Sequence, residues 1–124
     1  MTVAEPEHIF HIALTGDWEA AKRVGEYRMS TRGKTLDEVG FIHGSFRHQV
    51  ERIGSFLYSA VSEPVTVLEV DPTRVNAPVR VENLEGGTEL FPRIYGALPV
   101  DAVVATVPAS STGGRFVVKW LPAR

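Results

Sequence analysis

The spacing of apolar and polar residues predicts two short strands in the first half of the chain. Residues 8–13, HIFHIA, are mostly apolar and favour an extended segment whose side chains alternate between two faces. Residues 41–45, FIHGS, predict a second such segment. Each predicted strand carries one histidine, His11 in the first and His43 in the second, and each leads directly into a helical pattern.

A first helix is predicted directly after the first strand. Thr15 or Asp17 can cap its N-terminus, and Gly25 is a suitable stop. Its apolar residues have helical spacing and are expected to face the core; they are Trp18, Ala21 and Val24. The polar residues that follow, 26–34, predict a loop with one extended piece at Tyr27.

A second helix is predicted over about residues 46–60. Ser45 is well placed to cap it, and its apolar residues form a stripe that is expected to pack on the core. The stripe consists of Val50, Ile53, Phe56, Leu57 and Ala60. Between the two helices, Thr35 is expected to cap a single turn that Gly40 ends.

The second half of the chain predicts strands instead of helices. Segments rich in β-branched or alternating residues are 65–70, 79–83, 102–107 and 115–120, and a hairpin-like loop, SSTGG, precedes the last. Residues 90–96, LFPRIYG, predict an edge strand or a bend because Pro92 has no N–H to donate. The order of elements predicts an α+β fold with two helices in the N-terminal half and a split, mostly antiparallel β core.

Length and composition narrow the class of protein. A chain of 124 residues, 44% hydrophobic and 23% charged, predicts a single domain over 1–124 with a frayed start at 1–7. The net charge of −2 does not favour nucleic acid as a partner. The chain has no cysteine, so disulfides and thiolate chemistry are excluded. We find neither a signal-peptide pattern nor a membrane-length apolar run, and therefore expect a cytoplasmic protein without membrane attachment.

The two strand histidines are the first candidates for chemistry. A histidine on an apolar strand is most often a hydrogen-bonded core residue. Here, however, both strands lead into helices, whose free backbone N–H groups favour an anion such as phosphate. Imidazole can donate from one nitrogen and accept at the other, which suits a ribose hydroxyl. His11 and His43 are therefore candidate site residues, with Gly44 and Ser45 beside them as candidate ligand-binding residues.

The segment EGGTELFPRIYG, residues 85–96, is the second candidate. Glu89 lies just before an apolar stretch, where a carboxylate is either a surface residue or a site acid. Arg93 and Tyr95 alternate with Ile94, so the two side chains can share one face and contribute to ligand binding. The alternative for Arg93 is a solvated strand residue.

Several of these segments resemble a known family. IFHIA with DWEAAKRVGEY, GFIHGS, LEVDPTRV and above all ELFPRIYGALPVDAVVAT are similar to the small bacterial family called domain of unknown function 952, over about residues 8–107. That family has been grouped by fold and motif with the ADP-ribosyltransferases, which include RNA 2′-phosphotransferases and poly(ADP-ribose) polymerases.

The resemblance implies a function and a set of catalytic residues. It implies an ADP-ribosyltransferase-like protein that binds NAD or a related nucleotide and transfers ADP-ribose or a phosphate-linked group, with no metal. His11 would hold the ribose, His43 would pack on nicotinamide, and Glu89 would stabilise the cationic transition state. The acceptor is not indicated by the sequence.

Two further function classes remain open. A metal site could be built from two histidines and one carboxylate, although no short-range ligand motif supports it. A non-catalytic module could bind a nucleotide or metabolite, or present an interaction surface. Convergence of His11, His43 and Glu89 on one cleft would favour the enzyme.

Overall fold

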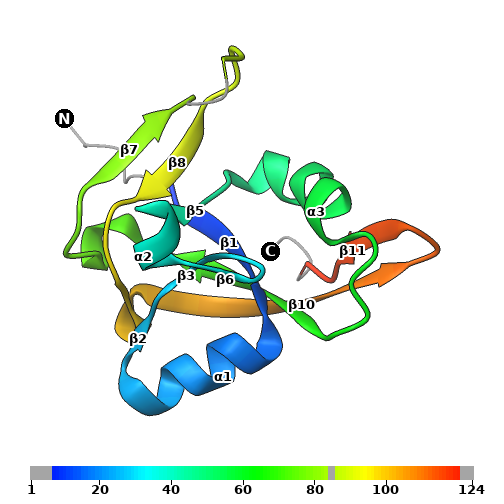
Figure 1. Cartoon of the computed structure of the whole chain (residues 1–124), viewed down its shortest axis with the longest axis horizontal. Coiled ribbons are helices and arrows are strands. Elements are labelled where there is room, and N and C mark those ends of the chain that lie inside the picture. The colour runs from blue at the N-terminus through cyan, green and yellow to red at the C-terminus, as the bar shows by residue number, and fades with distance from the viewer. Residues whose placement is uncertain (1–6, 84–85, 121–124) are drawn as a thin grey trace, which may run out of the picture.

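The structure, a computed structural model, describes residues 7–83 and 86–120 (Figure 1). The helices are α1 (Thr15–Val24), α2 (Leu36–Val39) and α3 (Val50–Tyr58), with short 3₁₀ turns at η1 (Arg47–Gln49), η2 (Pro72–Arg74) and η3 (Val100–Ala102). The strands are β1 (Ile9–Leu14), β2 (Glu26–Tyr27), β3 (Met29–Thr31), β4 (Lys34–Thr35), β5 (Ile42–His43), β6 (Val65–Val70), β7 (Val79–Glu82), β8 (Phe91–Ile94), β9 (Leu98–Pro99), β10 (Val103–Thr112) and β11 (Arg115–Val118). The predicted frayed start lies outside the described residues except for Glu7.

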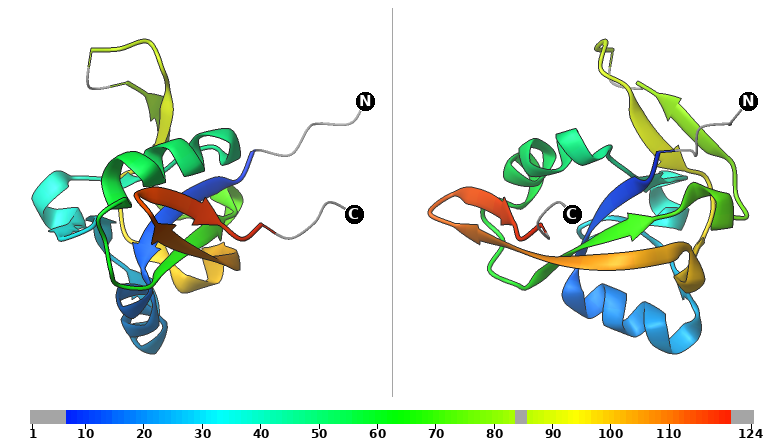
Figure 2. Two further views of the ribbon diagram at one scale, coloured as in Figure 1. Left: turned by 90° about the vertical axis from the view of Figure 1, so that its right-hand side faces the viewer. Right: turned by 180° about the vertical axis from the view of Figure 1, so that it is seen from behind.

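A four-stranded sheet, in the order β1-β6-β10-β11, forms the centre of the fold. Strand β6 lies between β1 and β10, and Val67 and Leu68 on its two faces are both fully buried. Helices α1 and α3 cover opposite faces of this sheet (Figures 1 and 2). Successive side chains of β1 point to opposite faces of the sheet and so enter two separate cores. Ile9 packs in the core on the α1 side, whereas Phe10 packs in the core on the α3 side.

A three-stranded sheet, in the order β5-β8-β7, stands beside the first. The two are joined where Phe10 of β1 and Ser45 exchange backbone hydrogen bonds, each with an N–O distance of 2.8 Å. Every strand pairing among the described residues is antiparallel. The predicted α+β class with a mostly antiparallel β core is therefore confirmed.

Strand β8 corrects the prediction of an edge or a bend, since it is the middle strand of its sheet. Pro92 pairs with Val81 of β7 on one side. On the other side, β5 pairs only with Arg93 and Ile94, so it ends before it reaches Pro92. A central strand can accommodate a proline here because β5 does not pair with it at that position.

The starts of α1 and α3 differ from those predicted, whereas the end of α1 and the start of α2 agree. Leu14 occupies the N-cap of α1 without a side-chain cap bond, and Ser45 belongs to the β bridge instead of capping α3, which begins five residues later. Gly25 adopts a left-handed conformation with φ of 94° and ends α1 as expected. Thr35 caps α2 in a reciprocal arrangement with Glu38.

Two further predictions need correction. Val24 was expected to face the core but is 76% exposed, and only Trp18 and Ala21 of the predicted apolar positions on α1 are buried. Strand β10 continues to Thr112, through most of the predicted hairpin loop. The chain reverses only at Gly113 and Gly114, whose positive φ values fit a tight two-residue turn, so the preceding serines stay in the β ladder.

Close packing of α3 on β11 makes Gly54 intolerant of a side chain. A Cβ at this position would lie 2.3 Å from the ring of Phe116. We expect Gly54→Ala to lower the free energy of unfolding by about 1–3 kcal/mol, measured by urea denaturation. The matched control is Gly16→Ala in α1, where a Cβ meets no atom within 4 Å; it should be neutral or stabilising by up to about 1 kcal/mol. Equal effects of the two substitutions would contradict this packing.

Candidate ligand-binding pocket

A pocket of about 370 Å³ lies between β1, β3, β5, β8 and the exposed end of α3. Its size falls at the lower end of the roughly 300–1,000 Å³ typical of small-molecule sites. The wall is mostly apolar with a few polar side chains, as such sites usually are. The described lining residues are Phe10, His11, Ile12, Ser30, Thr31, His43, Gly44, Ser45, Ile53, Phe56, Leu57, Tyr58, Phe91 and Arg93.

His11 is held at both ring nitrogens by the protein itself. Its Nδ1 lies 2.6 Å from the carbonyl oxygen of His43, which can only accept, so Nδ1 carries the proton. Nε2 then accepts a hydrogen bond of 2.8 Å from the hydroxyl of Tyr27. The ring is 2% exposed, and burial lowers its pKa to about 4, although the bond to His43 opposes the shift. His11 is therefore a neutral imidazole that links β1, β2 and β5.

His43 connects the second strand to the segment before it. Its Nδ1 lies 2.8 Å from the hydroxyl oxygen of Ser30 and 3.3 Å from the backbone carbonyl oxygen of the same residue. One face of the ring packs near Phe41, with the two ring centroids 4.8 Å apart. The side chain is only partly buried and reaches the pocket. Of the two histidines, His43 is the one better placed to contact a ligand.

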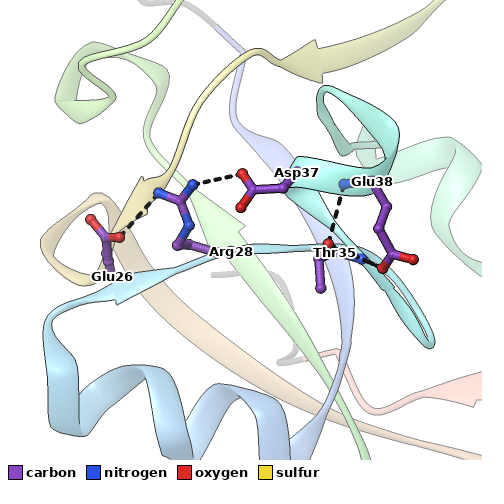
Figure 3. A network of polar contacts seen from close by, with 5 residues as sticks. All are labelled: Glu26, Arg28, Thr35, Asp37 and Glu38. Carbon is purple, nitrogen blue, oxygen red and sulfur yellow. Dashed lines mark hydrogen bonds and ion pairs between the residues drawn. The ribbon is translucent and has the colours of Figure 1, made fainter.

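Ser30 and Thr31 come from a segment that was predicted as a loop. Residues 26–35 instead form three short strands, β2, β3 and β4, of two or three residues each. Figure 3 shows what fixes this segment: Arg28 donates to Glu26 over 3.2 Å and to Asp37 over 2.9 Å. The Arg28 guanidinium thus joins β2 to α2 on the surface, and the contact with His43 itself joins Ser30 to β5.

Arg93 is a buried cation in the pocket wall. The residue is 2% exposed, and its NH1 group donates to the backbone carbonyl of Glu82 over 2.6 Å. Its guanidinium carbon lies 5.0 Å from the centroid of the Phe41 ring, in a cation–π arrangement. The alternative of a solvated strand residue is therefore wrong for Arg93.

Tyr95 packs near the same ring as Arg93 but does not reach the pocket lining. Its ring centroid lies 5.4 Å from that of Phe41, so Arg93 and Tyr95 do share one side of the strand, as predicted. The Tyr95 hydroxyl donates to the carboxylate of Glu82, and this bond raises the pKa of the phenol. Within the described residues Tyr95 is not part of the pocket wall.

Glu89 lies outside the described pocket lining, on the connection between β7 and β8. Its carboxylate accepts a hydrogen bond of 3.0 Å from the Gln49 side chain and forms an ion pair with Arg52 of α3. The structure thus brings His11, His43, Gly44, Ser45 and Arg93 to one pocket and places Glu89 and Tyr95 elsewhere. The catalytic role of Glu89 stays a prediction.

The mouth of the pocket is apolar and was not predicted as such. Phe56 is 82% exposed and Leu57 is 39% exposed, and both line the pocket together with Ile53. The helical pattern had assigned all three to a core-facing stripe. The stripe has the ordinary width of a core-facing one, so the sequence carried no signal that separates the two roles.

The expected anion site at helix N-termini is not part of this pocket. The first turn of α1, residues 15–17, is absent from the described lining residues. Strand β5 does not lead directly into α3 but into η1. An anion in the pocket would therefore not lie at the N-terminus of α1 or α3.

Metal binding receives no support from the geometry. Across residues 7–83 and 86–120, no group of three or more His, Asp or Glu side chains is placed to hold a metal ion. His11, His43 and Glu89 do not form such a group in this part of the chain, and the metal alternative stays untested. In the same part of the chain, none of the helices is both long enough and apolar enough to span a membrane.

The fold and the pocket define a small α+β protein with a ligand-sized, largely apolar site beside its central sheet. The chain belongs to the family described as protein of unknown function DUF952, whose model matches residues 12–106. This confirms the family resemblance that the sequence motifs predicted.

Solved structures of one other protein have the same fold. The crystal structure of protein CC0527 from Caulobacter crescentus superposes with a TM-score of 0.75 at 23% identity, covering 89% of this chain and 93% of that chain. Its solution NMR structure gives a TM-score of 0.70 and covers 88% and 90%. The comparison with curated proteins gave no match. The grouping with ADP-ribosyltransferases receives no support from these comparisons.

Proposed function

We propose that this protein binds a small metabolite in the pocket beside His43, without transforming it. The observation that carries the proposal is the combination of a cavity of about 370 Å³, an apolar mouth and convergent polar side chains from His43, Ser30 and Arg93. Such a combination is the usual form of a small-molecule site. NAD or a related nucleotide is the ligand class that the family resemblance implies.

Two contacts favour binding over catalysis. Both ring nitrogens of His11 are already hydrogen-bonded, so gripping a ribose hydroxyl would require one of these buried bonds to break. Glu89 is ion-paired with Arg52, away from the pocket wall. A carboxylate engaged in this ion pair is not directed at positive charge that develops beside His43.

The size of the pocket favours a part of a nucleotide over a whole dinucleotide. The cavity suits one ring with its substituents, whereas the remainder of NAD would extend past Phe56 and Leu57 into solvent. Contacts beyond the mouth would then be few. We expect fragments such as nicotinamide mononucleotide to bind about as tightly as NAD.

NAD cleavage with transfer of ADP-ribose or a phosphate-linked group is the second candidate. It is favoured by one observation, namely that His11 from β1 meets His43 and Ser45 from the segment of β5 at one pocket. It requires Glu89 to leave Arg52 and Gln49 and turn inward. The transferase candidate therefore predicts that Glu89→Ala abolishes NAD turnover while the fold stays intact.

An amide NMR titration with NAD, ADP-ribose, nicotinamide mononucleotide and nicotinamide tests the proposal. We expect saturable shifts at Gly44, Ser45 and Phe91 with a dissociation constant of about 1 mM or tighter for at least one compound. Leu57→Trp fills the mouth and should weaken binding about tenfold or more. Val24→Trp, an exposed apolar position outside the pocket lining, is the matched control.

An NAD-hydrolysis assay beside the titration separates the two candidates. Binding without turnover supports the module. Turnover that is lost in Glu89→Ala supports the transferase and overturns the non-catalytic proposal. Shifts confined to residues outside the pocket, or none with any of the four compounds, argue against nucleotide binding at this site.

A further inference from the structure

Arg93 brings a positive charge to the described wall of the pocket. Among the described lining residues Arg93 is charged, and neither aspartate nor glutamate occurs. His11, the most deeply buried titratable neighbour, is neutral because burial lowers its pKa. The described part of the wall therefore offers one cationic side chain to a ligand and no carboxylate.

We propose that the natural ligand is an organic anion, with one carboxylate or phosphate group directed toward Arg93 and an apolar body at the mouth. This inference rests on the proposed function, since it specifies the ligand of the same pocket. A guanidinium that is 2% exposed lies in surroundings of low polarity, where interaction with an anion is much stronger than in water. Charge-assisted hydrogen bonds are also the strongest that a ligand can form.

The polar part of the wall fits the oxygens of such a group. Ser30, Thr31 and Ser45 line the pocket with Arg93, and hydroxyl groups can donate to carboxylate or phosphate oxygens. The Ser30 hydroxyl is already held in place by the ring of His43. These side chains come from β3, from the β bridge after β5 and from β8.

The opposite part of the pocket fits an apolar body. Ile53, Phe56 and Leu57 line it from α3, and Phe56 leaves most of its ring in water. A ligand with an aromatic or aliphatic body would cover this surface and remove apolar area from water. Polar small ions, such as inorganic phosphate alone, would leave it exposed and should bind weakly.

Pairs of compounds that differ only in charge test the inference. Benzoate is compared with benzamide, and phenyl phosphate is added as the phosphate arm, each by amide NMR titration of the full chain. We expect at least one of the two anions to bind about tenfold more tightly than benzamide, with shifts at Ser45 and Phe91. The stronger of the two anions identifies the head group as carboxylate or phosphate.

A charge placed at the mouth provides a test that does not depend on altering the buried arginine. Phe56→Glu adds a negative charge at an exposed position of α3, so it should weaken anion binding more than benzamide binding. Val24→Glu is the matched control, an equivalent change on an exposed helix position away from the pocket, and should leave both unchanged. Arg93→Gln should abolish the preference for anions, provided that its amide spectrum stays dispersed.

The outcomes separate this inference from the proposal on which it rests. If benzamide binds in the pocket as tightly as both anions, the pocket is a ligand site but the anion preference is wrong. If no compound, neutral or anionic, shifts the pocket amides, both the inference and the proposed function are overturned. A preference for anions that Phe56→Glu leaves unchanged would place the anion outside the pocket and overturn the inference.

Discussion

Replacing His11 with alanine should lower the free energy of unfolding by about 3–5 kcal/mol, a large part of the roughly 5–15 kcal/mol that stabilises a domain. The substitution removes a buried ring and leaves a cavity between β1 and β2. It also leaves the Tyr27 hydroxyl and the His43 carbonyl without the partners that they have now. Urea denaturation followed by tryptophan fluorescence measures the loss.

A double-mutant cycle identifies the cause of that loss. Tyr27→Phe alone should be destabilising, because it leaves the buried Nε2 of His11 without a donor. In the His11→Ala variant, Tyr27→Phe should lower the free energy of unfolding by clearly less, since the hydrogen bond is already gone. His48→Ala, at an exposed position, is the control and should change stability by less than about 0.5 kcal/mol. Additive effects of the two core substitutions would contradict a direct bond.

Acidification should destabilise the fold through the same histidine. In the folded protein the pKa of His11 is lowered from the ordinary 6.5 to about 4, mainly because burial disfavours the charged ring. Between these two values the unfolded chain binds a proton that the folded chain does not, so stability falls as pH falls. The stability that depends on a neutral His11 is fully present above pH 6.5 and is lost by pH 4. The free energy of unfolding falls by about 3 kcal/mol over this range.

His11→Asn isolates this contribution, because asparagine does not titrate. The variant should be less stable at neutral pH but should lose less stability than the natural protein between pH 6.5 and pH 4.5. The exposed carboxylates of Glu38 and Asp71, whose pKa values are lowered by hydrogen bonds, add to acid destabilisation only at lower pH. An identical pH dependence in the variant and the natural protein would show that His11 is not the titrating group.

The sheet and helix content could be predicted where local pattern and burial agree. The β-branched run at residues 65–70 is buried on both faces, so it appears as a central strand in both sequence and structure. Gly25 and Gly40 end helices because each adopts a positive φ, a local property that the sequence reveals. Segment 26–35 was missed because its ladders are only two or three residues long, and because β2 pairs with β9, which lies far along the chain.

The candidate site could be predicted only in part. His11 and His43 do meet, but the flanking apolar residues could not reveal that the ring of one binds the backbone of the other. Phe56 could not be distinguished from a core residue, because a core stripe and an apolar pocket mouth have the same pattern. The position of Glu89 is determined by Arg52 and Gln49, which lie some forty residues earlier on α3 and η1.

The most direct test of the account is a crystal structure of the protein grown with the tightest-binding compound from the titrations. We predict ligand density inside the pocket, in contact with His43 and Phe91, with the apolar part of the compound against Ile53 and Phe56. An empty pocket with the ligand bound elsewhere on the surface, at saturating concentration, would contradict the assignment of this cavity as the functional site.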